Sequence, residues 1–263
     1  MAIVHPAIMT YNISSEVEAF STCRDGAGVS EGSYGSFNVS PYCNDSEEHV
    51  KKNLDTLASI LGLSAEKIVL PHQTHGIVCK TITNDFFALP NDERREFLEG
   101  VDALVTSLPH VCIGVTTADC VPVLLFDQKR KVTAAIHAGW RGTAAHIVRS
   151  TIEKLKLCFQ CNPADLVAVI GPSISLSAFE VGQETYDTFS ENGYKMSLVA
   201  EKKSDKWHID LWLANKMELL ESGVADDNII ISGICAYSNF RKFFSARRLS
   251  VNCGRIYNGI VMK

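Results

Sequence analysis

Four short apolar runs in the middle of the 263-residue chain constrain its fold more than any other feature. They occupy residues 111–115, 121–126, 132–136 and 166–170. Each run is rich in β-branched or other apolar residues and is short, so each predicts a buried strand with two apolar faces. The other elements do not follow a strict strand–helix repeat. We therefore predict an α/β (α+β) fold with mixed sheets.

Amphipathic helices are expected before and between these strands along the chain. The first has Asp45 as its N-cap, Glu48 three residues later, and Gly62 as its stop. A second opens at Gly142 and runs to about Leu157. Residues rich in Gly, Ser and Asn over 13–44 predict a long ordered loop. Further helices are predicted over 184–189 and 210–221, and further strands over 67–70, 77–82 and 229–231.

The composition argues against several classes of protein. Hydrophobic residues make up 46% of the chain, and no repeat or Pro-rich linker marks a boundary, so we expect one domain over residues 1–263. The formal net charge is −5, without the basic stripe that nucleic acids require. No stretch reaches the ~18 apolar residues of a membrane helix, and no secretory signal is visible. We expect a cytoplasmic monomer or homodimer that binds neither nucleic acid nor membrane.

The chain has nine cysteines, and one of them lies in a setting that suggests chemistry. An odd number in a chain of this length favours reduced thiols, and the Cys158–Cys161 pair lacks the second pair of a four-thiolate zinc site. Cys120 follows an acidic residue in the turn between two predicted strands. Three interpretations stay open for it: a small buried apolar residue, a nucleophile activated by His137 or His75, or a metal ligand beside both.

A thiolate and two imidazoles can bind one metal ion and leave a position open, which is the catalytic pattern of zinc. His137 ends a predicted strand, and His75 precedes a glycine that lets the backbone bend. His72, three residues before His75, would face the other side of a regular strand, so we expect it to support the site. Asp102 and Asp119 could orient an imidazole or transfer a proton, and a solvated turn or cap is the alternative for each.

The segment Ala138-Gly-Trp-Arg-Gly142 places polar and aromatic groups directly before a predicted helix. Unpaired amides at a helix N-terminus bind anions, and Arg141 adds a bidentate fork for phosphate or carboxylate. Trp140 could stack on a planar base, or belong to the core or an interface. The segment therefore indicates an anion and base pocket beside His137.

Several motifs together resemble the laccase-domain family over nearly the whole chain. They include an early loop over 24–30 and 34–38 and a tail over 243–248 with Gly254-Arg255. The four central motifs are His72-Gln-Thr-His-Gly76, Thr117-Ala-Asp-Cys-Val-Pro-Val123, Ile136-His-Ala-Gly-Trp-Arg-Gly142 and Gly171-Pro-Ser-Ile-Ser175. That family was long labelled multicopper polyphenol oxidase. Its members are now described as purine nucleoside phosphorylases that also cleave methylthioadenosine and deaminate adenosine, and bacterial relatives as peptidoglycan-editing factors.

The resemblance implies a fold, a metal site and a substrate pocket. The implied fold has four layers, α/β/β/α, with helices outside two packed mixed sheets. The implied metal ligands are His75, Cys120 and His137, with zinc preferred over copper. The candidates around the substrate are Arg24 and Arg141 for phosphate, and Ser36, Asn38, His72, Asp119 and Trp140 for the nucleoside or for proton transfer.

We therefore predict a zinc-dependent purine nucleoside phosphorylase with adenosine deaminase side activity. Its substrates would be adenosine, inosine or methylthioadenosine together with phosphate. The first rival is a metal-free cysteine hydrolase that uses Cys120 and His137 on cell-wall peptides. A copper-dependent polyphenol oxidase is the second, although one three-ligand centre does not supply the several copper sites of oxygen reduction. A binding or scaffold protein with a stabilising metal is the third.

Overall fold

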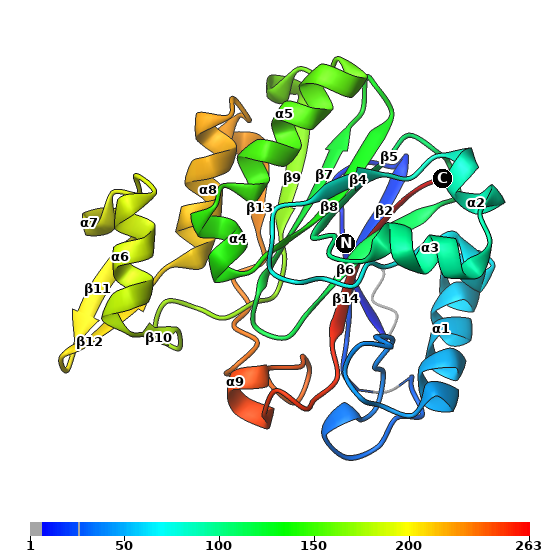
Figure 1. Ribbon diagram of the computed structural model, residues 1–263, viewed down its shortest axis with the longest axis horizontal. Coiled ribbons are helices and arrows are strands. Elements are labelled where there is room, and N and C mark those ends of the chain that lie inside the picture. The colour runs from blue at the N-terminus through cyan, green and yellow to red at the C-terminus, as the bar shows by residue number, and fades with distance from the viewer. Residues whose placement is uncertain (1–6, 26) are drawn as a thin grey trace.

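The computed structural model describes residues 7–25 and 27–263 and has two large sheets (Figure 1). In the first sheet β3 runs parallel to β6 and the other neighbours are antiparallel. Its strands, in spatial order, are β1 (Ile8–Tyr11), β2 (Val17–Thr22), β14 (Ile256–Met262), β6 (Cys112–Thr117) and β3 (Ile68–Val69).

The second sheet has six strands and is also mixed, because its two outer pairs are parallel and its inner pairs antiparallel. Its strands, in spatial order, are β13 (Ile229–Ile231), β9 (Leu166–Ile170), β7 (Val121–Asp127), β8 (Val132–Ala138), β5 (Ala103–Thr106) and β4 (Cys79–Thr81). A small separate sheet contains β10 (Glu180–Val181), β12 (Lys206–Ile209) and β11 (Ala200–Lys203). The four central apolar runs are all strands, as predicted.

Strand β7 shows why these runs are apolar throughout. Its side chains alternate between the two faces of the sheet. Val123 and Leu125 pack in the cluster that includes the helices α5 (Ile147–Phe159) and α8 (Leu211–Glu221). Leu124 and Phe126 pack against residues of the first sheet. Both faces are covered, so neither has a polar position.

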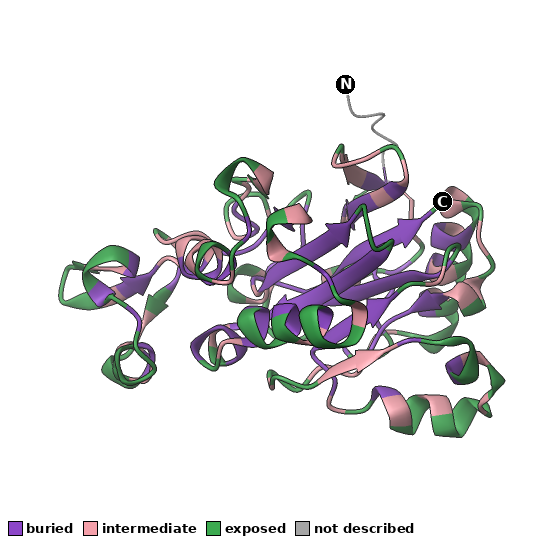
Figure 2. Cartoon of the chain, turned by 90° about the horizontal axis from the view of Figure 1, so that it is seen from above, coloured by how far each residue is buried: buried purple, intermediate pink, exposed green. Residues whose placement is uncertain are grey.

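The layers follow from the same pattern and confirm the predicted α/β/β/α arrangement. Helix α1 (Glu47–Leu61) covers the outer face of the five-stranded sheet, where Leu57 packs in one cluster with Phe20 and Tyr257. Helices α5 and α8 cover the outer face of the six-stranded sheet. Figure 2 shows the buried strands between helices whose outer sides are exposed.

Helix α1 was predicted well except at its first residue. It ends at Gly62, whose left-handed φ of 66° is the usual helix C-cap conformation. Its N-cap is Ser46, so the prediction of Asp45 was wrong. Asp45 instead accepts hydrogen bonds from the Ser30 hydroxyl and the Asn38 side-chain amide. Its carboxylate therefore connects the early loop to the start of the helix.

The predicted helix over 142–157 is two helices. Helix α4 (Trp140–Ala144) starts earlier than expected, and α5 follows after a break at His146, whose φ is 62°. A left-handed residue cannot continue an α-helix, so the chain changes direction there. Helices α6 (Gln183–Glu191) and α8 agree with the prediction, and Asp210 caps α8 by accepting a hydrogen bond from the Leu213 amide.

Other elements were not predicted. The expected loop over 13–44 contains β2, whose Val17 and Ala19 point into the core between the sheets. The C-terminal strand β14 is buried along its whole length in the centre of the first sheet. No helix among residues 7–25 and 27–263 has the length and apolar character needed to cross a membrane. The remaining helices are α2 (Asn84–Ala88), α3 (Asn91–Leu98), α7 (Met196–Val199) and α9 (Ala246–Leu249), with 3-10 turns η1 (Gly32–Tyr34), η2 (Ala65–Lys67), η3 (Pro163–Asp165) and η4 (Asp226–Asn228).

Candidate metal centre

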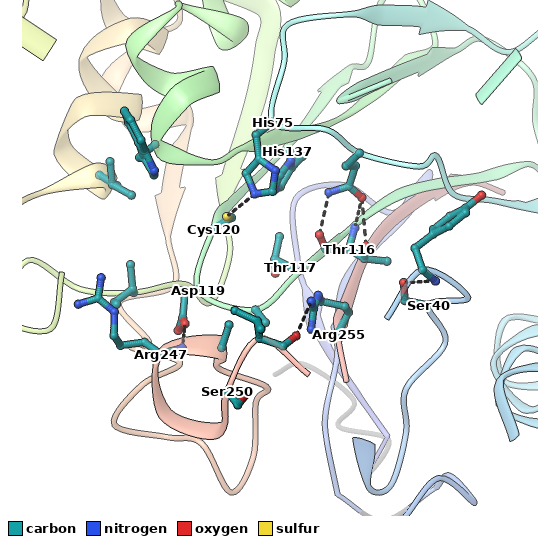
Figure 3. A pocket seen from close by; sticks show the side chains of 18 of the residues that line it. Ser40, His75, Thr116, Thr117, Asp119, Cys120, His137, Arg247, Ser250 and Arg255 are labelled. Atoms are coloured by element: carbon teal, nitrogen blue, oxygen red, sulfur yellow. Dashed lines mark hydrogen bonds between the residues drawn. The ribbon is translucent and has the colours of Figure 1, made fainter. Parts of the chain in front are cut away.

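The fold brings His75, Cys120 and His137 together (Figure 3). One donor atom from each of the three lies within 4.8 Å of the others, and Cys120 Sγ lies 3.8 Å from His75 Nε2. His75 is exposed, Cys120 is half-buried and His137 is buried. The three donors therefore form a group that is closed toward the core and open toward solvent.

Each member of this group lies where the chain passes between the sheets or ends a strand. His75 lies between β3 of the first sheet and β4 of the second, and Cys120 between β6 of the first and β7 of the second. His137 is the penultimate residue of β8. Gln73 holds the His75 loop against β6, because its side chain makes hydrogen bonds of 2.8 Å and 2.7 Å with the backbone of Thr116.

Asp102 is the residue that orients the two histidines. Its Oδ1 accepts hydrogen bonds from His137 Nδ1, at 2.7 Å, and from the His75 amide, at 3.0 Å. Its Oδ2 accepts from the amides of Gly76 and Thr74, at 2.7 Å and 3.3 Å. Because Nδ1 of His137 faces this carboxylate, Nε2 is left for the metal side. The hydrogen bonds from the backbone amides also hold His75 in its left-handed conformation, with φ 64°.

Electrostatics favour charged side chains at this centre. Burial opposes ionisation of the Cys120 thiol, but the neighbouring His137 and His75 rings outweigh it and lower its pKa to about 6. Burial likewise opposes protonation of His137, yet Cys120 and the Asp102 carboxylate raise its pKa to about 9. Burial of Asp102 is outweighed by its hydrogen bonds, mainly from His137, which hold its pKa below the usual value. A thiolate, the form that binds metal, is thus available at neutral pH.

The donor set fits zinc. On a tetrahedral ion with Zn–N of about 2.0–2.1 Å and Zn–S of about 2.3 Å, neighbouring donors lie roughly 3.5 Å apart, close to the 3.8 Å between Cys120 Sγ and His75 Nε2. Space beside the donors is reserved for them at Gly139. A Cβ on that residue would lie 2.9 Å from His75 Cδ2 and 3.2 Å from Cys120 Sγ. The chain therefore has a glycine where any side chain would press on two of the three donors.

The three donors line a cavity of about 780 Å³, large enough for a nucleoside-sized ligand. One part of its wall is apolar and contains Trp140, Ile174, Phe179 and Leu211. The rest is mainly polar and contains Ser40, Tyr42, His72, Gln73, Thr116, Thr117, Asp119, Arg247, Ser250 and Arg255. Such a division suits a ligand with a flat apolar part and a polar part.

A family model described as multi-copper polyphenol oxidoreductase laccase matches residues 18–263. The chain belongs to this family. A purine nucleoside phosphorylase of Bacteroides thetaiotaomicron is 45% identical over 250 residues, which cover 94% of this chain and 92% of that protein. Adenosine deaminase RL5, from an unknown prokaryotic organism, is 41% identical over 250 residues, covering 94% of each.

A solved structure of the same shape supports the assignment. The crystal structure of the Bacillus licheniformis hypothetical protein YfiH has a TM-score of 0.92 and 28% sequence identity, and the match covers 100% of this chain and 98% of that one. The laccase family resemblance drawn from the motifs is thereby confirmed. Its relatives carry the names of nucleoside-cleaving and deaminating enzymes.

In this laccase-family chain three of the expected substrate residues line the cavity. Trp140 belongs to the apolar wall. His72 is half-buried, its Nδ1 donates a 2.8 Å hydrogen bond to the Glu99 carboxylate, and its ring stacks on that of Tyr42 with the ring centres 4.5 Å apart. Asp119 accepts a 2.7 Å hydrogen bond from the Arg247 amide, and burial raises the pKa of its carboxyl. Their roles toward a substrate stay predictions.

Four other expected residues lie outside the cavity lining. Arg24 donates to the carbonyls of Gly35 and Phe240, so it holds the early loop in place. The Ser36 hydroxyl donates to the Arg24 carbonyl, and Asn38 is fully buried. Arg141 is exposed and lies over the Trp140 ring at 4.2 Å. Their predicted contacts with substrate have no support in this arrangement, and they stay untested predictions.

The predicted substrate residues did not include two arginines that line the cavity, Arg247 and Arg255. Both lie in the tail motifs by which the chain resembles its family, so the signal was present. Both lie more than 100 residues from Cys120 along the chain, and the fold brings them to the same cavity. Asp102 was considered only as one of two carboxylates near the strands, and the structure distinguishes it by its four hydrogen bonds.

Proposed function

We propose that this chain is a zinc-dependent purine nucleoside phosphorylase that also deaminates adenosine. The supporting observation is the group of three donors, His75, Cys120 and His137, on the wall of a nucleoside-sized cavity. The names of the relatives point to the same two reactions. Adenosine, inosine and methylthioadenosine are the proposed nucleosides. We propose further that residues 1–263 act as one catalytic domain, in the cytoplasm, as a monomer or homodimer.

The residues of the chain divide the work at the cavity. His75, Cys120 and His137 would hold the zinc, which would supply a Lewis acid at the cavity wall. Asp102 keeps the His137 ring in one tautomer and fixes the His75 backbone. Trp140 and Phe179 offer aromatic surfaces to a purine. Asp119, at the cavity wall, is our candidate for moving a proton to or from the base.

The two reactions make different demands on these residues. In deamination a water molecule replaces the amino group of adenine, and ammonia leaves. In phosphorolysis a phosphate oxygen forms a bond to the anomeric carbon while the bond from that carbon to the purine nitrogen breaks. The purine leaves with the electron pair and takes up a proton, and ribose 1-phosphate remains. Phosphorolysis alone therefore needs an anion site in the cavity.

The Cys120–His137 pair also keeps the cysteine hydrolase on cell-wall peptides as a second candidate. A thiol with a lowered pKa beside a histidine is the arrangement that such enzymes use. The position of His75 argues against the hydrolase, because a Cys–His dyad does not require a second imidazole 3.8 Å from the sulfur. Copper oxidation is disfavoured, because the described residues contain one group of this kind.

Product analysis tests these alternatives. Purified protein is incubated with adenosine, with and without phosphate, before and after treatment with a chelator, and the products are separated by chromatography. We expect adenine and ribose 1-phosphate with phosphate, inosine without it, and neither after chelation until zinc is restored. Full activity after verified metal removal, together with inactivation by thiol alkylation, would instead establish the hydrolase-type mechanism.

A further inference from the structure

The cavity has a positively charged side that the three metal donors do not explain. Arg247 and Arg255 both line it. The guanidinium groups of these two arginines donate to backbone carbonyls rather than to carboxylates. Arg247 donates twice to the carbonyl of Glu180. Arg255 donates to the carbonyls of Val251, Cys253 and Gly254. Carbonyls orient a guanidinium without neutralising it, so the positive charge remains available to a ligand.

The Asp119 carboxylate lines the same cavity but accepts no hydrogen bond from either guanidinium in the described part of the chain. Asp119 directs Oδ2 to the backbone amide of Arg247, at 2.7 Å, and its Oδ1 is buried. The His72 ring at the rim is already engaged by Glu99. In a chain whose net charge is −5, two arginines that line one cavity indicate an anionic ligand.

Two hydroxyl groups on the same side have hydrogens to donate. Thr117 Oγ1 accepts a 3.0 Å bond from the Asn258 side chain, and Ser250 Oγ accepts a 3.3 Å bond from the Asn252 amide. Within the described part of the chain neither hydroxyl hydrogen has an acceptor. Figure 3 shows Thr117, Ser250, Arg247 and Arg255 around the side of the cavity that lies away from His75.

The ligand that fits is a small anion rich in acceptor oxygens. Arginine forks and hydroxyl donors are the groups that bind phosphate, and the apolar wall with Trp140 and Phe179 offers no partner to it. Arg247 adjoins the apolar wall, because its Cζ lies 5.8 Å from the centre of the Phe179 ring, so the two parts of one reacting pair would be bound side by side. The buried Asn38 supports the charged side, because its Oδ1 accepts a 3.0 Å bond from the Arg255 amide.

We propose that Arg247 and Arg255, with the hydroxyls of Thr117 and Ser250, form the subsite for inorganic phosphate. The proposal rests on the proposed function and assigns its second substrate to residues. Phosphate held there is the nucleophile of phosphorolysis: one of its oxygens bonds to the anomeric carbon as the purine departs with the electron pair of the broken bond and is protonated. Deamination does not use this subsite.

The test compares two adjacent arginines. Arg247→Gln removes a guanidinium that lines the cavity. Arg248→Gln is the matched control, because Arg248 lies outside the lining and packs over Tyr237 and Phe240 at the surface. Initial rates of adenosine phosphorolysis are measured over a range of phosphate concentrations, and inosine formation is measured in the same samples.

For Arg247→Gln we expect the KM for phosphate to rise about tenfold or more, as the loss of a charge-assisted hydrogen bond predicts. The ratio of inosine to adenine formed at limiting phosphate should rise by a similar factor. Arg247→Lys should recover part of the loss, and Arg248→Gln should match the parent protein. An unchanged KM for phosphate, or equal losses in both reactions, would overturn the assignment.

A direct measurement separates this proposal from the proposed function. Arginine modification by phenylglyoxal is followed by peptide mass spectrometry, with and without inorganic phosphate and with adenosine monophosphate as a comparison. Protection of Arg247 and Arg255 by inorganic phosphate supports the subsite even in a protein that turns over no nucleoside. Protection by the nucleotide but not by phosphate assigns the arginines to a nucleotide, and no protection by either removes the subsite.

Discussion

Asp102 shows how much of the centre depends on one buried side chain. Each of its oxygens accepts two hydrogen bonds, and the four donors come from the His75 loop and from His137. A carboxylate can accept at all of these positions, whereas an amide of the same shape presents N–H groups to some of them. Asp102 thus acts as a positioning residue through the two histidines.

We predict that Asp102→Asn lowers zinc affinity by about 10–100-fold, the usual effect of removing a partner of a metal-bound histidine. Metal content after dialysis against a competing chelator measures this. Asp127→Asn is the control. Asp127 is also buried, at the end of β7, and its side chain accepts two hydrogen bonds from backbone amides of the turn between β7 and β8. Equal metal retention in the two variants would show that Asp102 is merely structural.

The pKa of Cys120 leads to a prediction about the metal-free protein. A pKa lowered to about 6 means that the thiolate is present at pH 7 and disappears as the pH falls through 6. Alkylation of Cys120 should therefore be half-maximal near pH 6, whereas alkylation of an ordinary thiol, with a pKa of 9.0, would be half-maximal near pH 9. Rates of iodoacetamide labelling, resolved by peptide, check this.

Zinc should abolish that labelling, because the sulfur is then a ligand. The exposed Cys158 lies outside the centre and should be labelled equally with and without zinc. A half-point for Cys120 near pH 9 in the metal-free protein would contradict the electrostatic role assigned to His137 and His75.

At the scale of elements, the β8–α4 junction serves both halves of the site. His137 ends β8, Gly139 leaves space for the donors, and Trp140 begins α4 on the cavity wall. Arg141, the next residue, is exposed and outside the cavity lining. These four residues of one junction therefore differ sharply in their expected effects.

We predict that Trp140→Ala raises the KM for adenosine by about tenfold, because base stacking on an aromatic ring contributes roughly 1–3 kcal/mol. Arg141→Ala should change the KM values for adenosine and phosphate by less than about threefold. Steady-state kinetics of the two variants check both statements. A large rise in the KM for phosphate in Arg141→Ala would restore the earlier assignment of Arg141 to the anion.

Gly139→Ala tests the same junction for metal binding. The added Cβ would lie 2.9 Å from the His75 ring, so we expect the ring to move and zinc affinity to fall. Gly62→Ala is the comparison, because its left-handed φ makes that variant less stable far from the metal donors. Zinc titration and thermal melts separate the effects: the first variant should lose affinity, the second only stability.

At the scale of the molecule, the metal donors connect the two large sheets. His75 and Cys120 lie in connections that leave the five-stranded sheet and enter the six-stranded one, and His137 ends a strand of the latter. An ion bound by all three would link both layers. It would therefore stabilise the folded chain as well as serve the chemistry.

We predict that chelation lowers the melting temperature. Zinc at about 100 times its Kd stabilises by about 2.7 kcal/mol, which corresponds to roughly 5–11 °C in a chain of this size. Calorimetry before chelation, after chelation and after readdition of zinc measures the change. The His75→Ala variant should melt near the chelated value and respond little to zinc. A verified metal-free protein with an unchanged melting temperature would refute the link.

Several features follow from local sequence. The apolar character of runs such as 121–126 predicts buried strands, because a strand that is covered on both faces has few polar positions. The stop of α1 at Gly62 and the cap of α8 at Asp210 are local backbone effects. The metal donors were recognised because a cysteine and two histidines at strand ends form an uncommon combination that also matched family motifs.

Local sequence was thus enough to predict the buried strands, the end of α1, the limits of α8 and the three candidate metal donors, since each depends on neighbours along the chain or on a motif. The contacts of those residues with distant segments became visible in the tertiary structure. It placed Arg247 and Arg255 in the cavity and directed Arg24 to backbone carbonyls elsewhere. It also gave Asp102 its four donors. Contacts between segments distant in sequence depend on the packing of two sheets, which no local pattern encodes.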